Sequence, residues 1–171
     1  LYDNDNMETY YQYYLNNGDN ITEQIKESSD YKKAIEEYIK ELFETFYYNI
    51  DDRIRNNSIT IFRAITVDDD WLPSFSKNKI IKLGVYWAYD SKGAVTHWGD
   101  YNKKNEVILS GIVELDKIDW EGTFLVKLRI DQSDEEMEIR LKEGVEIDLT
   151  SITIEGEEVD QKIFANNKFI A

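Results

Sequence analysis

The sequence contains no cysteine, one proline and one histidine among its 171 residues. The lack of cysteine excludes disulfide bonds, thiolate metal sites and cysteine nucleophiles. No apolar run approaches the roughly 18 residues that a membrane-spanning helix needs, so we expect no membrane association. Residues 1–8 hold three acids and no base, whereas a secretory signal begins with basic residues, so we expect no signal there.

Basic residues are also scarce: 20 Lys and Arg stand against 35 Asp and Glu, which gives a net charge of −15. A surface with this charge repels phosphate backbones, so we expect no direct nucleic-acid binding. The acidic excess is typical of a solvated, soluble surface. A second interpretation is an acidic decoy or inhibitor that occupies a basic site on another protein.

What the chain does have is enough apolar and aromatic content, 42% and 13%, to form a core. We expect residues 1–171 to form a single α+β domain, with a helical part over 1–56 and a mostly antiparallel β core over 57–171. The period of apolar residues predicts a helix over 31–46, capped by Ser29 or Asp30, and a weaker one over 6–15. β-branched and aromatic runs predict strands over 58–66, 83–89, 106–114, 122–130, 137–141 and 145–154, with helical turns over 91–98.

The run Glu136-Met137-Glu138 leads into the strand that is predicted over 137–141. Residues i and i+2 of a strand project from the same face, so both carboxylates are expected to reach one pocket from a rigid support. Acidic runs on loops are usually solvated, and the preceding Asp134-Glu135 fits that interpretation. The two readings of this run, solvated loop and paired catalytic acids, both remain open on spacing alone.

Arg63 lies in the middle of a predicted strand, on the same face as Ile59, Ile61 and Ile65. A charged guanidinium at such a position is costly unless it is paired or faces a cleft. One interpretation is an edge-strand arginine whose charge reaches water. The other is a fixed anion clamp, because the planar guanidinium donates two parallel hydrogen bonds to phosphate or carboxylate. Glu136 and Glu138 are the candidate partners.

The segment Tyr86-Trp87-Ala88-Tyr89 carries three aromatic residues, followed by Ala94 and His97. Such residues are most often core, but an aromatic face beside an arginine also suits a nucleotide with a flat ring. His97 is interpreted as a structural histidine, with proton transfer or ligand contact as the alternative. No carboxylate partners at metal-ligand spacing accompany it, so we expect no metal site.

In their order along the chain, these segments resemble mono-ADP-ribosyltransferases of bacterial toxins and of related phage and eukaryotic proteins. The resemblance covers residues 30–155 and rests on short motifs. These are a helical start, an Arg-bearing strand at Phe62-Arg63-Ala64, an aromatic strand followed by a helix with an alanine, and Glu136-Met137-Glu138 leading into Ile139-Arg140-Leu141 and a glycine turn. It implies an ADP-ribosyltransferase-like split β-sandwich and NAD as the substrate.

The resemblance also implies roles. Arg63 would hold NAD, either at its phosphates or by organising the pocket. Glu138 would bind the nicotinamide ribose and stabilise an oxocarbenium-like transition state, and Glu136 would orient or deprotonate a protein acceptor, with arginine expected. Tyr86, Trp87 and Tyr89 are candidates for the aromatic that lies against nicotinamide. The site of action would be either the cytoplasm or a host cell that receives the protein.

One motif differs from the family pattern. Many members carry Ser-Thr-Ser on the second strand, where the first serine supports the catalytic glutamate, whereas this chain has Tyr86-Trp87-Ala88. Either a tyrosine hydroxyl takes the place of the serine, as in the branch with a His-Tyr-Glu set, or the fold serves a non-enzymatic acidic binding or inhibitor protein, such as an immune-evasion factor.

Overall fold

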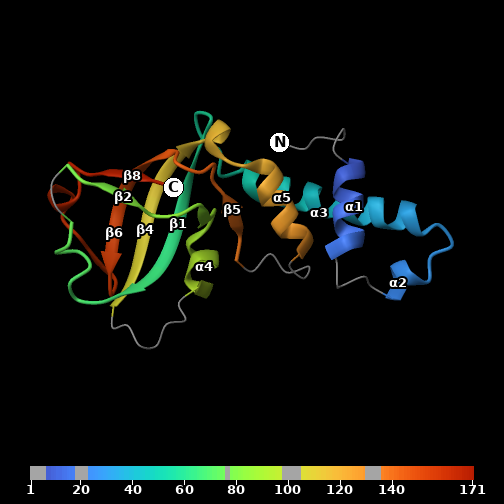
Figure 1. Ribbon diagram of the computed structural model, residues 1–171, viewed down its shortest axis with the longest axis horizontal. Helices are drawn as coiled ribbons and strands as arrows, with labels where there is room; N and C mark the ends of the chain where they lie inside the picture. Colours follow the sequence, from blue (N-terminus) through green and yellow to red (C-terminus); the bar gives the residue numbers. More distant parts are fainter. Residues whose placement is uncertain (1–6, 18–22, 76–77, 98–104, 130–135) are drawn as a thin grey trace. The chain divides into compact units, whose positions relative to one another are not determined.

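The computed structural model describes residues 7–17, 23–75, 78–97, 105–129 and 136–171 (Figure 1). Over these residues the fold is α+β, as the sequence predicts. Contacts within the chain divide it into two units, residues 1–52 with 120–134 and residues 53–119 with 135–171. The first unit is helical, and the second contains the sheet and the predicted site.

The core of the helical unit is built on one long amphipathic helix, α3 (Tyr31–Asp51), which confirms the period predicted from the sequence. Asp30 caps this helix by accepting a hydrogen bond of 3.2 Å from the Lys33 amide. The ring of Phe43 stacks on that of Phe124 at 4.6 Å between centroids, and α3 buries five apolar side chains in all. The other helices of the unit are α1 (Met7–Asn17), α2 (Glu23–Lys26) and α5 (Trp120–Arg129).

The strand predicted over residues 122–130 is wrong, because α5 occupies this stretch. Its β-branched and aromatic composition favours a strand. Its buried residues, however, include Thr123, Phe124 and Lys127, which have the spacing of one helix face. The Lys127 ammonium lies 4.9 Å from the centroid of the Phe46 ring, and this aromatic face accommodates its charge. The sequence pattern did not predict that this lysine is buried.

The second unit contains an 8-stranded sheet with the order β2-β8-β6-β4-β1-β3-β5, in which β7 pairs with β6 outside this path. The strand pairs are antiparallel except for β2 with β8, so the predicted mostly antiparallel arrangement is confirmed. The bounds are β1 (Ser58–Val67), β2 (Ile80–Lys82), β3 (Tyr86–Ala88), β4 (Asn105–Glu114), β5 (Glu138–Arg140), β6 (Glu146–Ile154), β7 (Glu157–Glu158) and β8 (Lys168–Ile170).

The sheet is strongly curled. The sequence predicts one strand over 83–89, but within this range the structure has only the three residues of β3 as a strand. Residues 83–85 join β2 to β3, and four other strands separate these two in the sheet. In a flat sheet these two strands would be about 24 Å apart, at about 4.8 Å per strand. The linking residues span about 14 Å at most. The two ends of the sheet must therefore approach each other.

The two faces of β1 have different neighbours. Ile59 and Ile61 are buried on the inner face of the curl, where Arg63 also projects by strand alternation. On the outer face Phe62 packs with Ala64, Ala88 and Ala94, so the short helix α4 (Ser91–Ala94) covers this part of the sheet.

The first turn of α4 is capped by Asp90, whose carboxylate accepts a 2.8 Å hydrogen bond from the Lys92 amide. The helical turns continue as η2 (Val95–His97), and residue 98, where the predicted turns end, lies outside the described residues. Short 3₁₀ turns also occur at η3 (Leu115–Lys117) and η4 (Gln161–Ile163). Within the described ranges, no helix combines the length and hydropathy that crossing a bilayer requires.

Candidate functional site

The three segments that carry the predicted site lie on neighbouring strands of the second unit. β3 lies between β1 and β5, and Ala88 is paired with Phe62 on one side and with Glu138 on the other. Strand pairing therefore brings the arginine strand, the aromatic strand and the Glu-x-Glu segment together, although they are far apart in the sequence. Figure 1 shows β5 at the end of the sheet beyond β1, with α4 beside it.

Glu138 is the first residue of β5 and is half-buried. As the partner of Ala88, it projects from the outer face of the sheet. Tyr86 is paired with Arg140 on the same face, and its side chain is 48% exposed. Glu138, Tyr86 and Arg140 thus form one polar and aromatic surface at this end of the sheet, which we call the β5 face.

Arg140 is a member of the β5 face that was not predicted as a site residue. Its guanidinium lies 5.9 Å from the centroid of the Tyr86 ring, and its Nη1 donates a hydrogen bond to Oδ2 of Asp119. Partial burial opposes the charge of Arg140, but the Asp119 carboxylate and the Tyr86 phenol outweigh it and raise the pKa of Arg140. Its position two residues after Glu138 on a strand was the signal in the sequence, because this spacing gives the same face.

Arg63 projects from the opposite, inner face and is held by the segment that joins β2 to β3. Its Nη1 donates a 2.7 Å hydrogen bond to the backbone carbonyl of Tyr86. A Cβ atom added to Gly84 would lie 3.1 Å from the same Nη1, so the guanidinium packs directly on this glycine. β1 lies between β4 and β3, so the edge-strand interpretation of Arg63 is wrong.

The environment of Arg63 also links it to Glu138. Burial lowers the pKa of Arg63 below its ordinary value, while the negative charge of Glu138 acts in the opposite direction. The two groups are therefore within electrostatic reach of each other, although they project from opposite faces. Of the two roles implied for Arg63, this geometry favours organisation of the site over direct contact with a ligand.

The aromatic residues of the predicted site divide between core and surface. Trp87 is 2% exposed and Tyr89 is 3% exposed, so both belong to the core. The Trp87 indole donates a 2.9 Å hydrogen bond to the Gly84 carbonyl, and the Arg53 guanidinium lies 5.1 Å from the centroid of the Tyr89 ring. Of these three side chains, Tyr86 is the one that presents its ring to solvent.

Glu136 does not lie on the strand. It is in a turn, and Met137 has a left-handed backbone with φ of +46° before β5 begins at Glu138. The prediction that both carboxylates project from the same face of one strand is therefore wrong, because strand alternation does not extend to Glu136. Glu136 is half-buried next to the strand, whereas Asp134 and Glu135 lie outside the described residues.

His97 is the last residue of η2. Among the residues that the structure describes, no group of three or more His, Asp or Glu side chains is placed to hold a metal ion.

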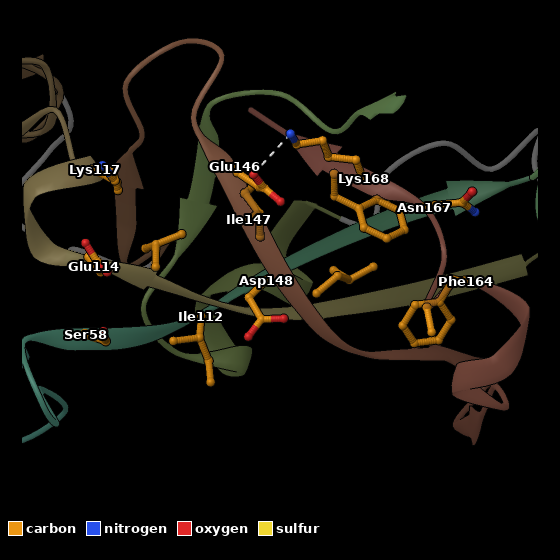
Figure 2. A pocket seen from close by; sticks show the side chains of 14 residues that line it. Ser58, Ile112, Glu114, Lys117, Glu146, Ile147, Asp148, Phe164, Asn167 and Lys168 are labelled. Atoms are coloured by element: carbon orange, nitrogen blue, oxygen red, sulfur yellow. Dashed lines mark ion pairs between the residues drawn. The ribbon is translucent and has the colours of Figure 1, made fainter. Parts of the chain in front are cut away.

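A groove with a volume of about 550 Å³ lies elsewhere in the second unit, along β4, β6 and the chain before β8 (Figure 2). Its walls carry Glu114 and Asp148, together with Lys168, whose ammonium lies 3.4 Å from the Glu146 carboxylate. None of the predicted site residues lines this groove. It is thus a separate concave surface of mixed charge.

Comparisons with protein-family models, with curated proteins and with solved structures give no significant match for this chain.

Proposed function

We propose that this chain is a mono-ADP-ribosyltransferase that transfers ADP-ribose from NAD to a protein side chain, with arginine as the expected acceptor. The observation that carries the proposal is the β1-β3-β5 neighbourhood, which places the Arg63, Tyr86 and Glu138 segments on adjacent strands. The resemblance of the sequence to this family requires these three segments to share one site.

The chemistry assigned to Glu138 follows from its charge and support. The glycosidic bond between ribose and nicotinamide breaks, nicotinamide leaves with the bonding electron pair, and positive charge develops on the ribose. A carboxylate fixed beside that charge stabilises the transition state more than the neutral substrate. A nucleophilic nitrogen of the acceptor then bonds to the ribose carbon and loses a proton. Glu138 is held for this role by strand pairing with Ala88.

Tyr86 is the residue best placed to contact the nicotinamide ring. Its exposed ring lies on the same face as Glu138 and beside the Arg140 guanidinium, which is itself held by a hydrogen bond to Asp119. A flat ring that stacks on Tyr86 would bring the adjoining ribose toward the carboxylate. Arg63 supports this arrangement from the inner face through its hydrogen bond to the Tyr86 carbonyl.

Nicotinamide release is the direct test. The wild-type chain is incubated with labelled NAD and a cell lysate, and release and transfer of label to protein are measured separately. Glu138→Gln should lower both by about 100-fold or more, the usual effect of removing a group that stabilises developing charge. Glu157→Gln is the matched control, because Glu157 is an exposed glutamate on β7. Absence of both release and transfer in the wild type would refute the proposal.

The alternative of an acidic binding or inhibitor protein is supported by the net charge of −15. It predicts affinity for a basic partner that falls steeply as salt rises, because the attraction between surface charges is screened. That affinity would be unchanged in Glu138→Gln. The same variant therefore separates the two functions.

A further inference from the structure

The backbone that leads into Glu138 is held in place by contacts with the segment around α4. The strand position opposite Glu138 is Ala88, which has no hydroxyl group to hold the carboxylate. The turn that leads into Glu138 is fixed instead by backbone contacts. The Tyr89 amide donates a 2.9 Å hydrogen bond to the Met137 carbonyl, directly before Glu138.

Gly93 in α4 makes the closest of these contacts. A Cβ atom added to Gly93 would lie 2.4 Å from the Glu136 carbonyl oxygen and 2.7 Å from the Met137 Cβ atom. Both distances are far shorter than van der Waals contact, and two of the obstructing atoms belong to backbone or to a Cβ that cannot rotate away. The α4 backbone thus touches the Glu136–Met137 turn at a position that admits glycine alone.

The segment that carries Gly93 is itself anchored at both ends. At its start, the Asp90 carboxylate accepts hydrogen bonds from the Lys92 amide and from the Arg53 guanidinium, the latter at 2.9 Å. At its end, Ala94 is 1% exposed and packs on the outer face of the sheet. Because contacts hold the segment at both ends, we expect the position of Gly93 to set the position of the turn.

We propose that the close contact of Gly93 with the Glu136–Met137 turn, anchored through Asp90, is the device that positions Glu138 for catalysis. Gly93 and Asp90 are positioning residues, since neither needs to touch NAD. The inference rests on the proposed function. In this chain a rigid backbone contact replaces the serine that supports the catalytic glutamate in the family it resembles.

The experiment compares Gly93→Ala with Ser91→Ala, an exposed residue of the same short helix. Nicotinamide release is measured as kcat and KM for NAD, and hydrogen exchange of the Tyr89 amide reports the contact itself. In Gly93→Ala we expect kcat to fall by about 100-fold, as a displacement near 1 Å can cause. KM should change little, and exchange of the Tyr89 amide should become faster. Ser91→Ala should behave as the wild type.

Asp90 gives a second test if Gly93→Ala does not fold. Asp90→Ala removes both the cap and the Arg53 partner and should lower kcat, whereas Asp90→Asn keeps the capping group and should recover most of it. Wild-type kcat in Gly93→Ala, or equal loss in Asp90→Ala and Asp90→Asn, would overturn the inference and leave the proposed function standing. An inactive wild type would refute the proposed function, and the positioning role with it.

Discussion

The Arg63 guanidinium donates a 2.7 Å hydrogen bond to the backbone carbonyl of Tyr86, across the inner face of the curled sheet. Arg63 lies on β1, and Tyr86 begins β3, immediately after the residues that connect β2, at one end of the strand order, to β3, next to the other end. The half-buried Arg63 guanidinium therefore holds the residues between β2 and β3 against β1. It also fixes the residue whose ring is exposed on the β5 face.

Gly84 offers the sharpest test of this contact. Gly84→Ala places a Cβ atom 3.1 Å from the Arg63 Nη1 at a backbone φ of +91°. Gly156→Ala is the matched control, since Gly156 has a similar φ of +81° with no atom within 4 Å of the added Cβ. The backbone penalty of about 1 kcal/mol is common to both variants. Gly84→Ala should lose about 1–2 kcal/mol more in the free energy of unfolding, because Arg63 must shift.

Urea unfolding of the two variants measures this difference directly. Equal losses of stability would show that the Arg63 guanidinium moves aside freely and does not hold the residues between β2 and β3 in place. The larger loss of unfolding free energy in Gly84→Ala should disappear when Arg63 is also replaced by alanine. That result would assign the additional loss to the contact between the two residues.

Periodicity in the sequence predicted the elements that depend on local order. The apolar period of α3 and the position of Arg63 on the Ile59 and Ile61 face are both found in the structure. In both cases a repeated spacing over many residues decides which face is buried. The adjacency of the Arg63 strand to the aromatic strand and to Glu138 is a matter of strand pairing. Spacing within one segment does not predict it.

The errors have equally specific causes. The composition of α5 is typical of a strand. Its residues Phe124 and Lys127 are buried by contacts with Phe43 and Phe46, which are remote in the sequence, and these contacts favour a helix. The left-handed backbone at Met137 separates Glu136 from β5, and a methionine gives no signal of that conformation. Tertiary contacts decide each of these features.

The ion pair of Asp90 predicts a change of stability in acid. The hydrogen bond from Arg53, with that from the Lys92 amide, lowers the pKa of Asp90 below its ordinary value of 3.8. Since the folded pKa is the lower one, the stabilisation is present above pH 3.8 and is lost as the pH falls through the folded value. The pair is partly exposed, so the effect is about 0.5–1 kcal/mol.

Wild type and Asp90→Asn are compared by urea unfolding at pH 7 and at pH 2.5. Wild type should be the more stable at neutral pH, and the two should converge in acid. Added salt should reduce the neutral-pH difference, because screening weakens a partly exposed pair. A difference that is the same at both pH values would show that the Asp90 charge does not contribute.

Tyr14 predicts alkaline sensitivity of the helical unit. Burial, with smaller contributions from Tyr38 and Tyr31, raises the pKa of Tyr14 to about 12. The folded state favours the neutral phenol. The contribution of Tyr14 to the stability of the fold is therefore complete below pH 10 and is lost as the pH rises from 10 to about 12. Tyr14→Phe should flatten the pH dependence of the melting temperature in this range. Tyr48→Phe, at a ring that is 77% exposed, should leave it unchanged.

Circular dichroism melting across the alkaline range gives the slopes, and phenolate absorbance shows whether one tyrosine ionises late. Identical slopes in wild type and Tyr14→Phe would contradict the assignment of this sensitivity to Tyr14. The slope is the decisive quantity, since loss of the hydroxyl also changes stability at neutral pH.

Glu136 and Glu138 should separate in function because they lie on different kinds of backbone. Glu138 begins β5, whereas Glu136 lies in the preceding turn. On the proposed function, Glu136→Gln removes the group that orients or deprotonates the acceptor. Hydrolysis of NAD, in which water takes the place of the acceptor, still has the Glu138 carboxylate to stabilise its transition state. Transfer to an arginine acceptor should therefore fall by about 100-fold, the usual effect of losing a general base. Release of nicotinamide in the absence of acceptor should change little.

The ratio of transfer to release, measured with one labelled NAD preparation, isolates this effect from changes in the amount of folded protein. Glu157→Gln should leave the ratio at its wild-type value, since Glu157 is exposed on β7. A parallel fall of transfer and release in Glu136→Gln would mean that Glu136 acts by shaping the turn against Gly93. In that case acceptor choice would have to be assigned to a residue other than Glu136.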